Sequence, residues 1–222
     1  MKWFFYLLKI ITYIPLRILF PVKVVNGKKI PKKEKIITVS NHLSAIDVVI
    51  ELSNLRGFRY TLAKKELAKS KFVKKFLELL GAIYVDRGNA DVTATKKVLS
   101  VLKNNRGLSI FPEGTRNKVD GGDMMPIKEG AAMFAIKTKT SLVPVMIYNK
   151  QKLFRKNYIY VGDEFELSQF YGQRLDSTAL KSASEIIEEH MHKTREELLA
   201  YVEQKKRGKK KIENQSDSTE NA

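Results

Sequence analysis

The sequence predicts an α/β domain with a mostly parallel central sheet flanked by helices. Short apolar runs alternate with helical patterns along the chain, an order that is typical of parallel sheets. The length of 222 residues is enough to bury one continuous core. A composition of 43% hydrophobic and 29% charged residues is ordinary for a globular protein. We therefore expect one domain over residues 22–206, preceded and followed by shorter segments.

The first segment, residues 1–21, has the pattern of an amphipathic helix. Lys9, Pro15 and Arg17 interrupt it, so it lacks the roughly 20 clean apolar residues of a transmembrane helix. At about 100° per residue, its polar and basic side chains fall on one side of the helix. These side chains are Lys2, Tyr6, Lys9, Tyr13 and Arg17. We expect a helix that lies in a membrane surface, with a short or tilted span and an ordinary core helix as the alternatives.

The residues after this helix favour attachment to the cytoplasmic face of the cell membrane. No small-x-small cleavage motif of a signal peptide follows the helix. Six lysines lie between positions 23 and 35, and each would add roughly 1 kcal/mol of attraction to a nearby anionic leaflet. Basic residues in this position also favour a cytoplasmic domain. We expect peripheral or monotopic attachment to the bilayer.

The remaining elements follow from the periodicity of the chain. Apolar runs at 36–40, 82–85, 108–111 and 142–148 predict buried strands, and 158–166 predicts a later strand. Helices are expected over 45–55, 66–80, 90–104 and 129–138, with Asn89 as the cap of the third. A long amphipathic helix is expected over 177–206. Residues 207–222 are basic and polar with almost nothing to bury, so we expect a disordered tail.

The composition limits the possible partners. Lysine and arginine number 41 against 24 acidic residues, and the formal charge of +17 favours nucleic acid, an anionic bilayer or phosphorylated substrates. Nucleic acid is not expected, because no helix-turn-helix, zinc-finger or RNP signature is present. The absence of cysteine excludes thiolate metal sites and an acyl-cysteine intermediate. His190 and His192 fall on different faces of a helix, so no metal is expected.

Three polar clusters directly follow predicted strands. Residues 41–47 follow the first, Asp86 and Arg87 follow the second, and residues 112–116 follow the third. Ligands of open α/β sheets bind at the carboxyl ends of the strands. We therefore expect the three clusters to meet at one pocket.

His42 and Asp47 are candidates for acid–base chemistry within the first cluster. A carboxylate that bonds one imidazole nitrogen fixes the tautomer and leaves the other nitrogen to take a proton. The alternative is a capping box, because Ser44-x-x-Asp47 would also satisfy backbone donors at a helix start.

Arg87 and Arg116 are candidates for phosphate binding. The guanidinium group binds phosphate through two parallel hydrogen bonds. Glu113 lies between a proline and a glycine, where it could accept hydrogen bonds from a polyol or hold an arginine. All three residues would also be ordinary on a solvated surface, and the residue types alone leave both interpretations open.

Four motifs resemble the glycerolipid acyltransferase family. NHLSAID at 41–47 looks like its H-x4-D signature, and GAIYVDR at 81–87, FPEGTR at 111–116 and VPV at 143–145 resemble its further motifs in the same order. The bacterial 1-acylglycerol-3-phosphate acyltransferase branch is similar in length and also has FPEGTR. This resemblance implies acyl transfer from an acyl-carrier-protein or coenzyme A thioester to the sn-2 hydroxyl of lysophosphatidate, which gives phosphatidate without a further cofactor.

The resemblance also implies roles for individual residues. His42 would be the general base and Asp47 its partner, while Arg87 and Arg116 would contact the phosphate. Glu113, Gly114 and Thr115 of FPEGTR would help to form the acceptor site, and Lys64 in the LAKKEL run is a weaker phosphate candidate beside Lys65. Tyr84 stands where the second motif usually has phenylalanine.

Several alternatives to this function remain open. Glycerol-3-phosphate or another lysophospholipid could be the acceptor, since related branches share H-x4-D. A non-catalytic membrane lipid-binding module would keep the N-terminal helix and the basic pocket without the chemistry. The absence of a G-x-S-x-G elbow agrees with direct transfer to the acceptor.

Overall fold

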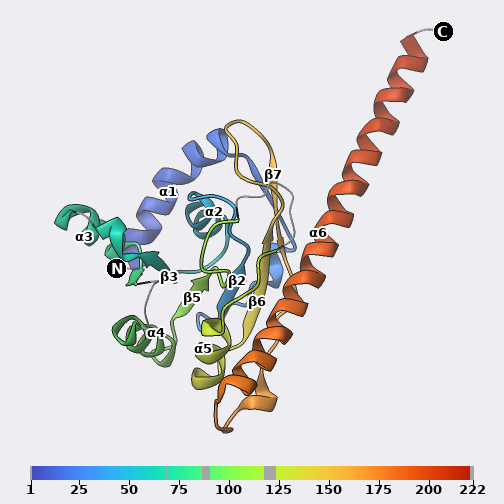
Figure 1. Cartoon of the computed structure of the whole chain (residues 1–222). Helices are drawn as coiled ribbons and strands as arrows, with labels where there is room; N and C mark the ends of the chain where they lie inside the picture. Colours follow the sequence, from blue (N-terminus) through green and yellow to red (C-terminus); the bar gives the residue numbers. More distant parts are fainter. Residues whose placement is uncertain (1, 69, 87–90, 118–123, 221–222) are drawn as a thin grey trace.

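A computed structural model describes residues 2–68, 70–86, 91–117 and 124–220 (Figure 1). The strands are β1 (Val22–Val25), β2 (Ile37–Ser40), β3 (Arg59–Lys64), β4 (Ala82–Val85), β5 (Gly107–Ile110), β6 (Leu142–Ile147) and β7 (Asn157–Val161). The helices are α1 (Lys2–Leu19), α2 (Asp47–Asn54), α3 (Lys71–Leu79), α4 (Val92–Lys103), α5 (Gly130–Thr138) and α6 (Ser177–Glu220). Short 3-10 turns lie at Gly27–Lys29 (η1), Lys65–Ala68 (η2) and Ser168–Phe170 (η3).

The seven strands form one mostly parallel sheet, as the sequence predicts. Their order is β1-β7-β6-β2-β5-β3-β4, and only β6 and β7 pair antiparallel. β2 therefore lies between β6 and β5 at the centre of the sheet. The loops that follow β2 and β5 leave the sheet at the same edge, because these neighbouring strands run in the same direction.

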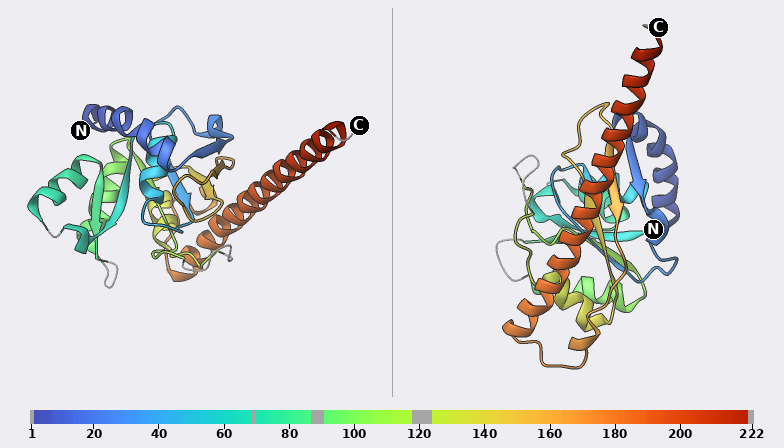
Figure 2. Two further views of the ribbon diagram at one scale, coloured as in Figure 1. Left: turned by 90° about the horizontal axis from the view of Figure 1, so that it is seen from above. Right: turned by 90° about the vertical axis from the view of Figure 1, so that its right-hand side faces the viewer.

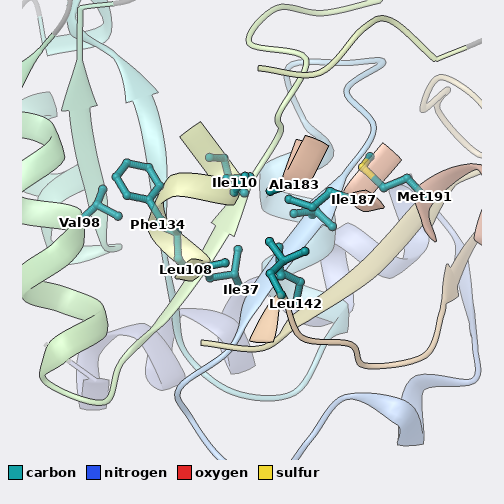
Figure 3. Packing of buried hydrophobic residues seen from close by; sticks show 14 of the residues in the cluster. Ile37, Val98, Leu108, Ile110, Phe134, Leu142, Ala183, Ile187 and Met191 are labelled. Carbon is teal, nitrogen blue, oxygen red and sulfur yellow. The ribbon is translucent and has the colours of Figure 1, made fainter. Parts of the chain in front are cut away.

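Helices cover both faces of the sheet, and each face has its own apolar core. Side chains of α4, α5 and α6 pack on the first face around Ile37, Leu108 and Leu142 (Figure 3). α1 and α2 contribute to the second core, which also contains Val143, Val145 and Ile147 of β6. The alternation of Leu142 and Val143 between the two cores follows the period of two in a strand. The domain is thus a three-layered α/β structure.

The structure differs from the predicted elements in the outer part of the sheet, at the edge strand β1 and at β3, which lies next to the other edge. β1 and β3 were not expected, because VKVV and RYTLAK contain charged residues and lack a continuous apolar run. The helix expected over 66–80 is split into η2 and α3, and Ser70 caps α3 by accepting the N–H of Val73 at 3.1 Å. Asp91, not Asn89, caps α4, and Asn89 lies outside the described residues.

The prediction of a disordered tail over 207–222 is wrong as far as Glu220. α6 continues through these residues and leaves the body of the protein (Figures 1 and 2). Val202 is the last buried residue of this helix as far as position 208, and residues 203–208 are exposed. However, lysine, arginine, glutamate and glutamine are good helix formers, and an existing helix extends at little cost because only nucleation is unfavourable.

The N-terminal helix α1 is present, and several of its described apolar side chains are exposed. Leu16 and Phe20, at its C-terminal end, pack against the second core. Trp3, Ile10 and Ile14 are 75%, 71% and 66% exposed. In the described part of the chain, every helix is too short or too polar to span a bilayer.

Candidate active site

The loop between β2 and α2 is fixed to the end of β6. The side-chain amide of Asn41 donates to the backbone oxygen of Ile147 at 3.0 Å and accepts the Ile147 N–H at 2.8 Å. These two bonds resemble a backbone pair of a sheet and hold the loop at the carboxyl edge. His42 follows directly and is only 8% exposed.

The structure brings His42 and Asp47 together. Imidazole Nδ1 lies 3.3 Å from Oδ2 of Asp47, whose side chain is fully buried. The same oxygen accepts the backbone N–H groups of Leu43 at 2.7 Å and Ser44 at 2.5 Å. Asp47 therefore fixes both the loop and the imidazole, and a bond at Nδ1 leaves Nε2 to take a proton.

The capping-box alternative is correct in part, because the Asp47 side chain accepts the Ser44 N–H, but Ser44 does not cap the helix. Ile46, not Ser44, is the N-cap of α2, and no side chain caps the helix. Asp47 nevertheless satisfies backbone donors, as that alternative required, but the donors belong to the His42 loop. One carboxylate thus combines the two interpretations that the sequence left open.

Glu113 holds the main chain of His42 from the neighbouring strand. Its Oε1 accepts the N–H of His42 at 3.2 Å, and the N–H of Asn117 donates to the His42 oxygen at 2.7 Å. The FPEGTR loop and the residue after it therefore hold both the N–H and the C=O of His42, on the two peptide units that flank its Cα. Burial raises the pKa of Glu113 from 4.5 to about 7, while the N–H groups of His42 and Met125 partly offset this shift.

The raised pKa of Glu113 makes the stability of the protein depend on pH. The folded protein binds this proton more tightly than the unfolded chain, so the free energy of unfolding should fall as the pH rises from about 4.5 through about 7. In Glu113→Gln, which keeps an oxygen for the His42 N–H, this contribution should be lost. Urea unfolding at several pH values measures it, with Glu166→Gln on the surface as the control. Identical pH profiles for wild type and Glu113→Gln would contradict the prediction.

An apolar cavity of about 300 Å³ adjoins His42. β3, β4, β5 and the helices α2 and α5 supply its apolar wall. The apolar lining consists of Val48, Leu62, Val85, Ile110, Phe111, Ala131, Met133 and Phe134. The Phe111 ring also packs against the imidazole of His42, with 4.5 Å between the ring centroids. The base candidate therefore faces a space that suits an apolar substrate.

The other predicted site residues are only partly brought to this cavity. Gly114 lines it, whereas Thr115 and Arg116 are exposed and do not. Lys64 is exposed and pairs with Glu66 at 3.0 Å. Arg87 lies outside the described residues. The expected convergence therefore holds for the first and third clusters and, through Asp86, for part of the second.

Lys128 was missed by the sequence analysis. It lines the cavity together with His42, and no other basic side chain among the described residues does so. Its side chain lies over Gly114, where an added Cβ would be 2.8 Å from Lys128 Cε. Gly114 also has φ +71°, a backbone conformation that favours the glycine of FPEGTR. Nothing in the PIKEG run at 126–130 distinguished Lys128 from the other 40 basic residues.

In the part of the chain that the structure describes, histidine, aspartate and glutamate nowhere gather in a group of three that could hold a metal ion.

The structure therefore places a buried histidine–carboxylate pair at the carboxyl edge of an α/β sheet, beside an apolar cavity, an arrangement in which the free imidazole nitrogen can take a proton. A model of the family described as Acyltransferase matches residues 21–148, more than half of the chain. The chain belongs to this family, which confirms the resemblance seen in the four motifs.

Similar proteins of known sequence carry one name. The chain is 37% identical to the 1-acyl-sn-glycerol-3-phosphate acyltransferase of Borreliella burgdorferi, over 62% of this chain and 55% of that protein. It is 29% identical to the protein of the same name from Bacillus subtilis, over 67% of this chain and 76% of that protein. The match to the Saccharomyces cerevisiae protein of that name covers 46% of its length, so the chain spans about half the length of several of these relatives.

A solved structure has the same fold. The 1-acyl-sn-glycerophosphate acyltransferase of Thermotoga maritima superposes with a TM-score of 0.66, covering 88% of this chain and 78% of that one. At 23% sequence identity this likeness shows the fold, and it confirms the predicted mostly parallel α/β architecture.

Proposed function

We propose that the protein is an enzyme that transfers a fatty acyl group from an acyl-carrier-protein or coenzyme A thioester to the sn-2 hydroxyl of lysophosphatidate, which yields phosphatidate. The observation that carries the proposal is the buried His42–Asp47 pair beside an apolar cavity. Family membership and the shared name of the bacterial relatives support this reaction and this acceptor.

The reaction is a direct transfer. Nε2 of His42 takes the proton of the acceptor hydroxyl while its oxygen attacks the thioester carbonyl. The tetrahedral intermediate then expels the thiolate, which takes the proton from the imidazolium, so an ester bond forms as the C–S bond breaks. A thiol is a good leaving group, with a pKa near about 8.5, so the base matters most in making the alcohol nucleophilic. No cofactor beyond the acyl donor is required.

The cavity is the place that we assign to an acyl chain. Its volume of about 300 Å³ lies at the lower end of the range of small-molecule pockets, and aliphatic or aromatic side chains form most of its wall. A chain held there would place its carbonyl carbon near His42, which lines the same cavity. Proximity of this kind lowers the barrier when the reacting atoms are aligned.

The phosphate of the acceptor requires cations near His42. We assign this role to Arg87, Arg116 and Lys64 by resemblance, with Glu113, Gly114 and Thr115 forming the acceptor site. Lys128 joins them because its side chain lines the cavity itself.

Lys128→Met should raise the KM for lysophosphatidate about tenfold, because the substitution removes a charge-assisted contact with the phosphate. The methionine side chain still covers Gly114. The KM for the acyl donor should change little. Steady-state kinetics with lysophosphatidate and with monoacylglycerol, which lacks the phosphate, measure the effect. Lys137→Met, an exposed substitution on α5 outside the cavity, is the matched control. An equal loss with monoacylglycerol would contradict the role of Lys128.

The remaining partner is the bilayer. We propose peripheral or monotopic attachment to the cytoplasmic face of the cell membrane, through residues 1–21. The exposed apolar side chains of α1, together with the basic residues that follow it, support this contact.

Acyl transfer by the purified protein tests the function. Labelled acyl-carrier protein and acyl-coenzyme A are offered separately with lysophosphatidate, glycerol-3-phosphate or lysophosphatidylethanolamine, and the lipid products are identified by mass spectrometry. Formation of phosphatidate from lysophosphatidate is expected. Transfer only to glycerol-3-phosphate or to another lysophospholipid would identify that compound as the acceptor in place of lysophosphatidate. Binding of lipid without any transfer would favour the non-catalytic module and overturn the proposal.

A further inference from the structure

Helix α3 is exposed over most of its length. No residue of α3 is buried, and residues 71–76 are all exposed. Phe72 is 82% exposed, Val73 42% and Phe76 38%, and Leu67 in the preceding turn η2 is 56% exposed. Two exposed phenylalanines one helical turn apart are unusual on a surface that contacts only water.

Basic side chains accompany these apolar ones. Lys71, Lys74 and Lys75 are exposed on the same helix, and Lys64 and Lys65 precede it. Glu66 and Glu78 are the acidic residues of the segment 64–79. Exposed aromatic residues beside lysines are typical of a helix that lies in the interface of an anionic bilayer, where the ammonium groups remain with the phosphates. A surface that binds a protein partner would be expected to carry aromatic residues and arginine rather than lysine.

The position of α3 connects it with both the N-terminal helix and the cavity. Figures 1 and 2 place α3 near the N-terminal end of α1, on the side of the molecule opposite the extended part of α6. α3 is also the crossover between β3 and β4, which pair in parallel at the edge of the sheet. Leu62 of β3 and Val85 of β4 line the cavity beside His42.

We propose that α3 is a second membrane contact, in which Phe72 and Phe76 enter the interface of an anionic bilayer and Lys71, Lys74 and Lys75 contact its phosphates. The purpose of this contact, which is to bring the site close to its lipid substrates, rests on the proposed function. The contact itself is independent of catalysis. With α1 alone, the domain could rotate about one attachment. A second contact fixes its orientation and holds the strands that line the cavity close to the bilayer, so an acyl chain travels a short path through water.

Vesicle binding by the full chain tests this contact. Phe72→Gln/Phe76→Gln removes the apolar groups and keeps good helix formers, so it should weaken partition onto phosphatidylglycerol–phosphatidylcholine vesicles about tenfold. Lys71→Gln/Lys74→Gln/Lys75→Gln should weaken binding to these vesicles and leave binding to pure phosphatidylcholine unchanged. Leu199→Gln, an exposed apolar residue on α6 that is 40% exposed, is the control and should bind as wild type. Circular dichroism confirms that each variant is folded.

The outcomes separate this inference from the proposed function. Weaker binding of the phenylalanine variant supports the contact even in a protein without acyltransferase activity. In an active protein, the same variant should lose activity on vesicle-embedded acceptor and keep it on a short-chain, water-soluble acceptor. Binding equal to that of wild type overturns the proposal. A phenylalanine variant that changes only the oligomeric state, measured by sedimentation, also overturns it and assigns the surface to a second copy of the chain.

Discussion

His42→Ala should lower kcat for acyl transfer by about 10²–10⁴-fold, the usual contribution of a positioned general base. The imidazole is the only described histidine near the cavity, and Asp47 at 3.3 Å keeps Nε2 directed away from the carboxylate. The apolar wall remains in the variant, so the KM for the acyl donor should change little. Single-turnover measurements with preformed enzyme–donor complex separate the chemical step from binding and product release.

Asp47 variants provide the control for this prediction. Asp47→Asn keeps an oxygen for the N–H groups of Leu43 and Ser44 but loses the charge that stabilises the imidazolium. It should therefore lower kcat with little loss of stability, whereas Asp47→Ala should lower both. If His42→Ala retained activity within about threefold of wild type, His42 would not be the base.

Glu51→Ala should reduce the free energy of unfolding by about 3–5 kcal/mol, a large effect for a residue outside the site. Glu51 on α2 is fully buried beneath the His42 loop. Its two oxygens accept the hydroxyls of Thr38 at 2.8 Å, Ser40 at 2.7 Å and Ser109 at 2.9 Å. The variant would leave three buried hydroxyls without this partner.

The buried Arg59 adds to the expected cost. Burial lowers the pKa of its guanidinium group, and the charge of Glu51 partly offsets this shift. Glu51→Gln keeps an oxygen for the hydroxyls of Thr38 and Ser109 and loses the charge and the acceptor of the Ser40 hydroxyl, so it should cost less than Glu51→Ala. Urea unfolding curves measure both, with the exposed Glu166→Ala as the matched control. A loss below about 1 kcal/mol for Glu51→Ala would show that the hydroxyls find other partners.

The sequence predicted the parts of the site that are close along the chain. His42 and Asp47 are five residues apart in a strand-to-helix loop, so their contact follows from local geometry. The hydrogen bond between Glu113 and the His42 N–H joins residues 71 positions apart, and only the parallel pairing of β2 and β5 brings them together. The sequence therefore indicated that Glu113 mattered without indicating its contact with the His42 backbone.

The fold, like the site, was predicted from the sequence in some parts and not in others. The central strands β2, β5 and β6 are buried on both faces and have continuous apolar runs, which the sequence analysis found. β1 contains the exposed Lys23, and β3 begins with the buried Arg59 and ends with the exposed Lys64, so neither strand has a continuous apolar run and their pattern was weak. Lys128 reaches the cavity from the segment before α5, which depends on a tertiary contact with Gly114 that no local pattern encodes.

The hydroxyls around Glu51 favour one register between strands β2 and β5 during folding. Thr38 and Ser109 are opposite each other in the β2–β5 ladder, and both donate to the same oxygen of Glu51. Sliding β5 by one residue would turn its hydroxyl to the other face of the sheet and present an apolar side chain to a buried carboxylate. Misaligned folding intermediates are therefore penalised at the centre of the sheet. The native register is also the one that allows Glu113 to accept the His42 N–H, so correct pairing of β2 and β5 also positions the His42 loop.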